Sequence, residues 1–168
     1  MRFFIRTPAL ALVAATALLV QTGLAAAADT MPEPASKPTA STGSKERITV
    51  AREAIKAKDF KKSIAELTLA VKEHPGNAEL YNLLGFSYRK QPTPDLARAF
   101  EYYRLALKVD PEHRGANEYI GEAYLMDKKP AKAEEHLTKL KSICGNTTCE
   151  EYQDLAKSIT DYKAKNKS

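Results

Sequence analysis

An apolar pattern in two parts recurs three times between about residues 44 and 145, and it restricts the possible folds more than any other feature of the chain. In the first part of each unit, Leu84 lies 34 residues after Val50, and Ile120 lies 36 residues after Leu84. The second part repeats over the same stretch, at Ser63, Ala99 and Ala133. A period of this size, with two helical stretches in each unit, is typical of a solenoid built by stacking helix pairs. The sequence therefore predicts an all-helical stack that presents a curved surface to another molecule.

Small residues stand at the positions where the two helices of a unit have to approach closely. They are Gly85, Ala99, Gly121 and Ala133. Larger side chains, among them Tyr103 and Leu137, are expected to fill the space around them. The middle unit also carries two extra residues. Because both of its helices keep their internal phase, we assign this insertion to the turn at 91–95.

The middle unit resembles the tetratricopeptide repeat. Its residues follow the order of that family's motif at Tyr81, Leu84, Gly85, Tyr88, Ala99, Tyr103, Ala106 and Pro111. The third unit is similar but has Gly145 in place of the turn proline, and the first unit diverges most. The resemblance implies a right-handed α-solenoid of three helix pairs (44–77, 78–113 and 114–147), with a groove lined by the first helix of each pair.

Capping residues predict where the helices begin. Asp59 is expected to cap the second helix of the first unit, Thr93 followed by Pro94 to start that of the second, and Pro130 that of the third. A capping box from Thr148 to Glu151 predicts a final helix within 148–168. Its apolar stripe consists of Tyr152, Leu155, Ala156, Ile159 and Tyr162. We expect this helix to cover the last repeat, because repeat arrays need a polar end.

The first 28 residues have the pattern of a secretory signal peptide. Arg2 and Arg6 precede an apolar run over about residues 9–20, and small residues end at Ala28. An uncleaved membrane anchor is the alternative, but the apolar run is shorter than the roughly 20 residues that span a bilayer. Residues 29–43 are rich in Pro, Ser, Thr and Ala, which predicts a flexible linker. The expected location is periplasmic or secreted, with no membrane anchor after cleavage.

Cys144 and Cys149 are the only cysteines, and they flank the turn before the last helix. In an exported chain, such a closely spaced pair predicts a disulfide. A thiol-exchange site is the alternative, because a thiolate at the first turn of a helix is favoured by the helix dipole. The spacing is not that of a metal site, and no metal is expected.

The remaining composition does not favour catalysis or nucleic-acid binding. No glycine-rich phosphate loop, nucleophile elbow or zinc-binding histidine spacing occurs in the sequence. The formal net charge is +5, and it falls to +3 without Arg2 and Arg6, which is too small an excess to indicate nucleic acid. We therefore expect neither enzymatic activity nor a cofactor.

The resemblance implies that partners bind to the first helices, on the side that faces away from the packing stripe. These residues are Arg52 and Lys56 in the first unit, Asn82, Phe86, Arg89 and Lys90 in the second, and Glu118, Glu122, Leu125 and Met126 in the third. The predicted groove is basic at one end and acidic at the other, with Phe86 and Leu125 as apolar anchors. Of the residues with which some family members clamp a carboxylate, only Asn82 is matched.

The sequence thus predicts a non-catalytic interaction module, an adaptor or scaffold that binds a protein or peptide in the cell envelope. Three alternatives stay open. The polar groove residues could be only the solvated side of each helix. The chain could be a thiol-dependent helper of protein maturation that uses Cys144 and Cys149. It could also be a structural subunit that associates with its own copies.

Overall fold

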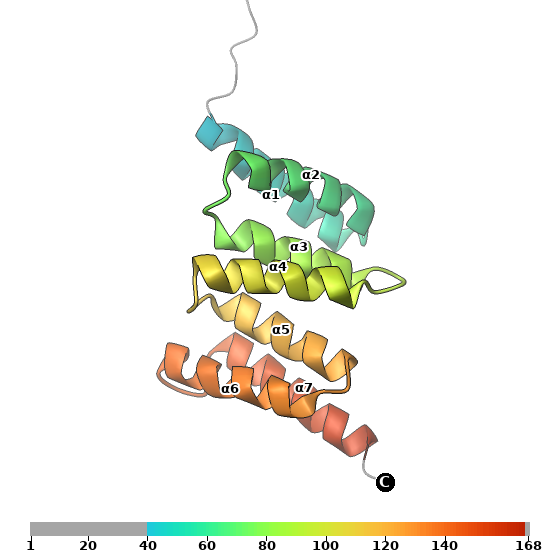
Figure 1. Cartoon of the computed structure of the whole chain (residues 1–168), viewed down its shortest axis with the longest axis vertical. Helices are drawn as coiled ribbons and strands as arrows, with labels where there is room; N and C mark the ends of the chain where they lie inside the picture. The colour runs from blue at the N-terminus through green and yellow to red at the C-terminus, as the bar shows by residue number, and fades with distance from the viewer. Residues whose placement is uncertain (1–39, 167–168) are drawn as a thin grey trace, which may run out of the picture. The chain divides into compact units, whose positions relative to one another are not determined.

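The computed structural model describes residues 40–166, and these residues form seven α-helices. They are α1 (Ala40–Lys56), α2 (Phe60–Glu73), α3 (Ala78–Lys90), α4 (Leu96–Val109), α5 (Arg114–Met126), α6 (Pro130–Cys144) and α7 (Glu150–Lys165). The helices follow one another along the stack in chain order (Figure 1). None of these helices combines the length and the apolar character that crossing a membrane requires.

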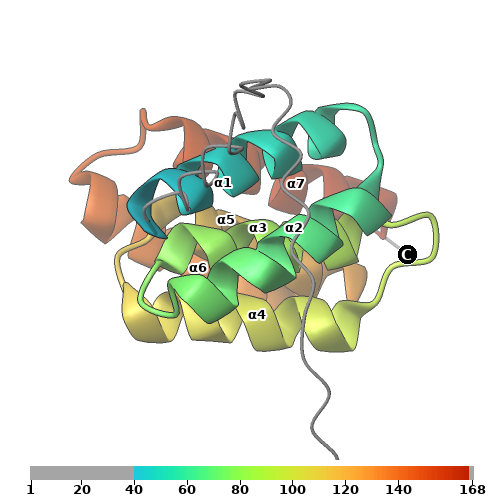
Figure 2. The same cartoon turned by 90° about the horizontal axis from the view of Figure 1, so that it is seen from above.

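The first helices of the units, α1, α3 and α5, and the second helices, α2, α4 and α6, have different neighbours. Each second helix packs against its own first helix and against the first helix that follows, so that α4 lies between α3 and α5. The first helices also contact one another, α3 with α5 and α5 with α7. Seen along the stack, α1 and α7 lie on one side and α4 on the other (Figure 2). By its neighbours, α7 occupies the place of a first helix after the third pair.

Helix α1 begins earlier than the sequence indicates. The predicted linker extends to residue 43, but the helix already starts at Ala40. Its first turns run beside the end of α2, where Arg47 pairs with Glu66 at 3.1 Å and with Glu73 at 3.3 Å. Low apolar content does not prevent a helix that an adjacent helix supports. The rest of the linker and the predicted signal peptide lie outside the described residues.

The core consists of two apolar clusters. The first joins α1 to α5 and includes Leu67, Leu84 and Tyr103. The second joins α5, α6 and α7 and consists of Leu125, Ala133, Leu140, Leu155 and Ile159. Tyr124 packs against both clusters. Its ring lies 4.7 Å from that of Phe100 and 5.8 Å from that of His136.

The predicted close approaches occur at the two glycines of the repeated pattern, Gly85 and Gly121, but with different partners. A Cβ atom on Gly85 would lie 2.6 Å from the ring of Tyr103 in α4, which is the expected contact within a helix pair. A Cβ atom on Gly121 would lie 2.6 Å from Leu155 in α7. Gly121 therefore makes room for the last helix, a role that the sequence pattern did not reveal.

Two of the predicted helix starts are confirmed and one is wrong. Asp59 accepts a hydrogen bond from the Lys62 amide at 3.0 Å, and α6 begins at Pro130. The start of α4 differs, because its cap is Asp95, whose side chain accepts from the Arg98 amide at 3.0 Å. Thr93 and Pro94 belong to the connection 91–95, which has five residues where the other two units have three, so the insertion lies in the turn as predicted.

The predicted capping box at the last helix is also wrong. Helix α6 ends at Cys144 and is capped by Gly145, which has a left-handed φ of 68°, and α7 begins only at Glu150, with Cys149 at the cap position. Thr148 instead donates from both its amide and its hydroxyl to Asn146 Oδ1, each at 2.8 Å. The cap and the helix start therefore each lie one residue later than the capping box predicts. The predicted stripe is nevertheless correct, because Leu155 and Ile159 are buried.

Candidate binding groove

Helices α3, α5 and α7 bring equivalent positions side by side. Their first residues are Ala78, Arg114 and Glu150, so that equivalent positions are separated by 36 residues in each step. One such row consists of Asn82, Glu118 and Asp154, and the next of Phe86, Glu122 and Ser158. A hydrogen bond of 3.2 Å from the Ser158 hydroxyl to Glu122 Oε1 joins the second row. We call the surface over these rows the groove.

An open cavity of about 380 Å³ lies at the C-terminal end of the groove. It is lined by Arg89, Glu122, Leu125, Met126, Ser158, Asp161, Tyr162, Lys165 and Asn166. The first four of these residues were predicted from the sequence, and the other five come from α7 and the residue after it. Sequence reasoning assigned α7 only a covering role. The available signal was its spacing, because Tyr162 lies 36 residues after Met126.

Arg89 is the best-connected side chain of the groove, and it is only 5% exposed. Its Nη2 lies 2.6 Å from Glu122 Oε2, and its Nε donates to the Tyr103 hydroxyl at 3.1 Å. The guanidinium also lies 5.5 Å and 5.4 Å from the ring centroids of Phe86 and Tyr119. Burial raises the pKa of Tyr103, which keeps its hydroxyl neutral beside the cation. Arg89 therefore joins α3, α4 and α5, and its charge is already balanced by Glu122.

Glu118 is the opposite case, a buried carboxyl group without a partner. It is 7% exposed, and no hydrogen bond or ion pair joins it to another of the described residues. Burial raises its pKa to about 8, and the nearby carboxylates of Glu122, Asp154 and Glu151 add to this shift. Arg89 only partly opposes them. The region between α5 and α7 thus has more carboxyl groups than cations to balance them.

In the N-terminal part of the groove, the polar side chains bond to one another around Glu79. Its Oε1 lies 2.6 Å from Arg52 Nη2, and its Oε2 accepts from Asn82 Nδ2 at 3.2 Å. His113 Nε2 lies 3.3 Å from the same Oε2. Burial opposes the charge of Glu79, but hydrogen bonds from these three side chains outweigh it and hold its pKa below the usual value. The amide group of Asn82 is therefore already engaged by Glu79, although its buried Oδ1 has no partner.

The ten predicted groove residues differ widely in accessibility. Arg52, Lys56, Lys90 and Met126 are exposed, Phe86 and Glu122 are partly buried, and Asn82, Arg89, Glu118 and Leu125 are buried. Leu125, a predicted apolar anchor, lines the cavity but is only 8% exposed, because it also belongs to the second core cluster. Met126, 44% exposed, is the accessible apolar side chain beside it. The binding role of these residues stays a prediction.

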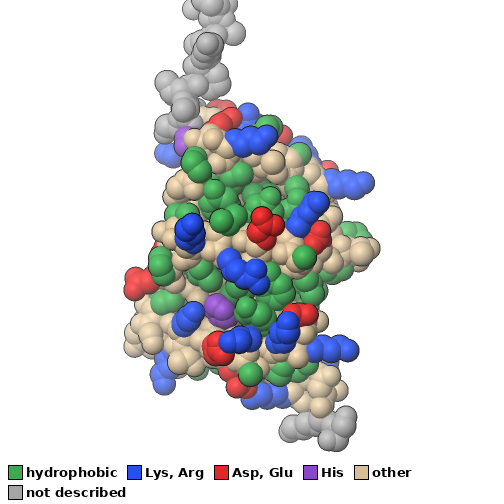
Figure 3. Space-filling model, in the orientation of Figure 1, with side chains coloured by type: hydrophobic (Ala, Val, Ile, Leu, Met, Phe, Trp, Pro, Cys, Tyr) green, Lys and Arg blue, Asp and Glu red, His purple; other side chains and the backbone are tan. Residues whose placement is uncertain are grey.

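The second helices, α2, α4 and α6, form another face of the stack (Figure 1). Side chains of both charge signs are interspersed there with hydrophobic ones (Figure 3). Two of the exposed large apolar side chains, Leu69 and Val109, belong to these second helices. They are 43% and 41% exposed, close to the value for Met126. They therefore provide a matched reference surface for experiments on the groove.

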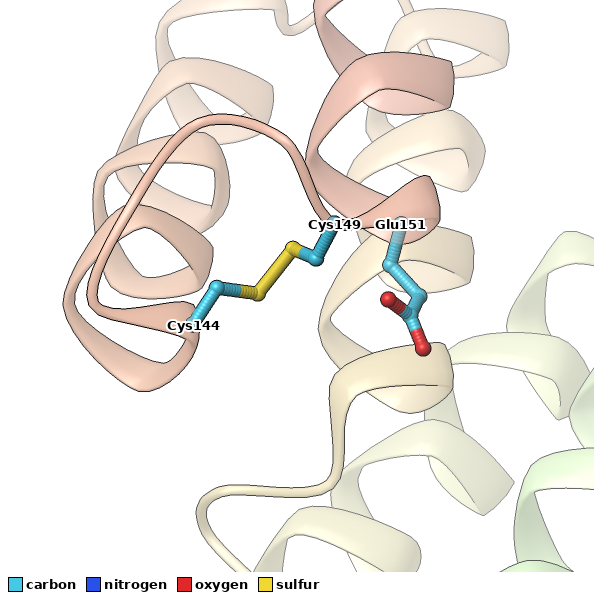
Figure 4. A group of neighbouring side chains, drawn as sticks. All are labelled: Cys144, Cys149 and Glu151. Atoms are coloured by element: carbon cyan, nitrogen blue, oxygen red, sulfur yellow. A yellow bond between two sulfur atoms is a disulfide. The ribbon is translucent and has the colours of Figure 1, made fainter.

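The two cysteines form a disulfide, as predicted. The Cα atoms of Cys144 and Cys149 are 6.3 Å apart, and the bond links the end of α6 to the residue before α7 (Figure 4). Within residues 40–166, the two sulfur atoms and a Glu151 oxygen are also the one group of three potential metal ligands that lie within 4.8 Å of one another. Because both sulfur atoms are bonded to each other, neither is a thiolate that could hold a metal ion.

Comparisons with known proteins identify the fold. No protein-family model matches the sequence, and a search of curated proteins gives no match either. Among solved structures, the TPR2B domain of yeast Sti1 in complex with pHsp70 matches with a TM-score of 0.66 at 16% identity, over 74% of this chain and 98% of that one. The Yersinia enterocolitica type III secretion translocator chaperone SycD matches with a TM-score of 0.63 at 12% identity, over 74% and 95%.

A third solved structure, the first TPR of Spaghetti (RPAP3) bound to the HSP90 peptide SRMEEVD, has a TM-score of 0.58 at 16% identity, over 72% of this chain and 95% of that one. Identities this low show the fold alone. The chain has the tetratricopeptide-repeat fold, an all-helical solenoid, as its sequence predicts.

Proposed function

We propose that this chain is a non-catalytic adaptor or scaffold that binds an extended segment of a partner protein along its groove. The open cavity between α5 and α7 carries this proposal, because it combines an accessible apolar side chain, Met126, with polar groups from three helices. Apolar contacts supply affinity at such sites, and a few placed polar groups orient the ligand. The Ser158 hydroxyl donates to Glu122, but this carboxylate is paired with the buried Arg89, so that binding is the function the cavity residues suit best.

The solved structures support this proposal by analogy of fold. The Sti1 domain is described in complex with pHsp70, the Spaghetti domain is bound to an HSP90 peptide, and SycD is a chaperone. All three share the helix stacking described above. Since function resides in a site and not in a fold, the analogy makes a protein partner the first choice but does not identify it.

We further propose that the partner belongs to the cell envelope or the extracellular space. Two observations support this location. The first 28 residues have the charge and apolar pattern of a signal peptide. Cys144 and Cys149 form a disulfide, and such bonds persist mainly in oxidising compartments.

Photocrosslinking from the groove tests the binding proposal. A photoreactive amino acid replaces Met126 in one variant and Leu69 on α2 in the other, because the two native side chains have nearly equal exposure, 44% and 43%. The variants are expressed in the organism that produces the protein, and crosslinked proteins are identified by mass spectrometry. We expect Met126 to capture a defined partner that Leu69 does not capture.

Equal capture from both positions, or capture from Leu69 alone, would contradict binding in the groove. A charge reversal at Lys56 is a useful addition, because this predicted groove residue is exposed and has no ion pair among the described residues, whereas Arg52 holds Glu79 at 2.6 Å. The same change at Arg89 is unsuitable, since its buried guanidinium holds Glu122 and Tyr103 in place. Loss of binding in an Arg89 variant could not be separated from loss of structure.

A further inference from the structure

The acidic region between α5 and α7 is defined by four carboxylates, and we call it the acidic cluster. Glu118 and Glu122 come from α5, and Glu151 and Asp154 come from α7. The cluster adjoins the cavity, because Glu122 belongs to both. Glu118 lies one helical turn before Glu122 on α5. Two of the four charges have partners, since Glu122 pairs with Arg89 at 2.6 Å and Glu151 lies 3.6 Å from Arg114. Glu118 and Asp154 have no cation within ion-pair distance among the described residues.

Glu118 is the observation that points beyond an ordinary solvated surface. A carboxylate on an exposed helix face is fully hydrated, but Glu118 as a residue is only 7% exposed, and its carboxyl oxygens keep limited contact with solvent. An unpaired charge in such a place costs free energy unless a partner compensates it. The pKa of Glu118 is raised for the same reason, first by burial and then by the charges of Glu122 and Asp154. The folded chain thus retains an unfavourable group at the floor of an open groove.

The arrangement of the carboxylates indicates which kind of cation would suit the cluster. A metal ion needs ligand oxygens at about 2.0–2.6 Å, and so within about 5 Å of one another. Within residues 40–166, no three of these four carboxylates meet that condition, because the one group that does contains the cysteines. Carboxylates spread over two helices suit a larger cation. The planar guanidinium of arginine has five donors, and the ammonium of lysine has three.

We propose that the acidic cluster is a subsite for a basic side chain, arginine or lysine, of the partner segment that binds in the groove. The inference rests on the proposed function and specifies its partner. Met126 and Tyr162 would contact apolar residues of the segment, while the basic side chain lies between α5 and α7 against Glu118 and Asp154. The groove would therefore select a segment in which basic and apolar residues alternate, and it would reject acidic segments through charge repulsion.

Three synthetic peptides test this assignment on the purified protein. They are identical glycine-flanked peptides in which leucine alternates with a variable residue, which is arginine, citrulline or glutamate. Citrulline keeps the shape of arginine without its charge. Backbone amide shifts of the protein in NMR titrations report both the affinity and the place of binding. We expect the arginine peptide to bind about tenfold more tightly than the citrulline peptide, with the largest shifts in α5 and α7.

Two variants locate the effect. Glu118→Gln removes the carboxyl group that can ionise against a bound cation but keeps the shape of the side chain. We expect it to weaken binding of the arginine peptide about fivefold and to leave binding of the citrulline peptide unchanged. Glu101→Gln is the matched control, because Glu101 is an exposed acid on α4. It should change neither affinity. Circular dichroism of both variants shows whether the helices are retained.

The other outcomes separate this inference from the proposed function. Equal affinity for the arginine and citrulline peptides would overturn the basic subsite but leave a groove that binds peptides. Preference for the glutamate peptide, or no binding of the arginine peptide up to about 1 mM, would also overturn it. In these cases the crosslink from Met126 still decides whether the groove binds a natural partner.

Discussion

At the scale of single residues, burial favours the neutral form of two ionisable groups, with opposite consequences for stability. Glu118 has a folded pKa of about 8 against 4.5 in its reference state. The folded state therefore retains this proton to higher pH, and its contribution to stability is lost as the pH rises from 4.5 to 8. His136 has a folded pKa of about 4 against 6.5, because burial and then Lys139 disfavour its charge. Its contribution is complete above pH 6.5 and is lost as the pH falls to 4.

The stability of Glu118→Gln should therefore exceed that of the unmodified protein by an amount that grows with pH. Near pH 4 the two should be nearly equal, because Glu118 is then largely protonated in both the folded and the unfolded state. Near pH 8.5 we expect an advantage of at least about 1 kcal/mol, the equivalent of roughly one pKa unit. Urea unfolding at several pH values measures the difference, with Glu101→Gln as the control. A constant difference across this range would show that Glu118 does not lose its proton on unfolding.

Several residue-level features of the groove could not be inferred from the sequence, because they depend on contacts between units. Arg89 was predicted to present its charge to a partner, but Glu122 from the next unit and the ring of Tyr119 enclose it. Leu125 was predicted to be accessible, but α7 and α6 cover it. A periodic pattern shows which side of a helix faces its own pair. It does not show how far the following helix covers the opposite side.

At the scale of the elements, two turns share a conformation that neither lysine favours. Lys58 and Lys128 have positive φ angles of 59° and 58°, and each follows the first helix of its unit. In the second of these turns, the Lys128 amide donates to the Leu125 carbonyl at 3.1 Å, and the Lys129 amide donates to the Tyr124 carbonyl at 2.8 Å. A left-handed conformation costs a residue with a Cβ atom about 1–2 kcal/mol, whereas glycine adopts it readily.

Replacing Lys128 with glycine should therefore stabilise the protein. Glycine removes the free-energy cost of the left-handed conformation, and this gain exceeds the cost of the extra entropy that glycine loses on folding. The expected net increase in the free energy of unfolding is about 0.5–1 kcal/mol. The midpoint of thermal unfolding measures the change. Ala65→Gly, at an exposed position in the interior of α2, is the control and should destabilise by about 1 kcal/mol. If Lys128→Gly lowered the midpoint as Ala65→Gly does, its turn would not be the strained element that the angle indicates.

The sequence predicts most helices well, and it fails where two local signals compete. Thr93 and Asp95 are both acceptable caps before α4, and Asp95 is used because Leu96 and Ala99 fix the phase of the helix against α3. At α7, the Asn146 turn takes the hydroxyl group that a capping box would need. The role of α7 in the groove was missed for a different reason. This helix matches the spacing of the first helices but not the residue pattern of the repeat.

At the scale of the whole described unit, stability depends on the contacts that connect the two core clusters. The first cluster holds α1 to α5, and the second holds the end of α5 with α6 and α7. Tyr124 packs against both, with ring contacts of 4.7 Å to Phe100 and 5.8 Å to His136. In stacked repeats each unit contacts only its neighbours, so that stability passes from one end to the other through such contacts. The groove lies across this connection.

Tyr124→Ala should therefore separate the stabilities of the two clusters. Gly85→Ala provides the perturbation, because its Cβ would lie 2.6 Å from the Tyr103 ring, and overpacking of this kind costs about 1–3 kcal/mol. With Tyr124 present, we expect Gly85→Ala to accelerate amide hydrogen exchange in α3 and α4 and also in α6 and α7. With Tyr124→Ala, the acceleration should be confined to the first cluster, since α6 and α7 then open independently. Tyr162→Ala, which removes a ring that packs only against the second cluster, is the control and should leave the transmission intact. If Gly85→Ala still accelerated hydrogen exchange in α7 when Tyr124 is replaced by alanine, the backbone packing of α5 alone would couple the two clusters. The groove would then be a single rigid surface, whatever side chain stands at position 124.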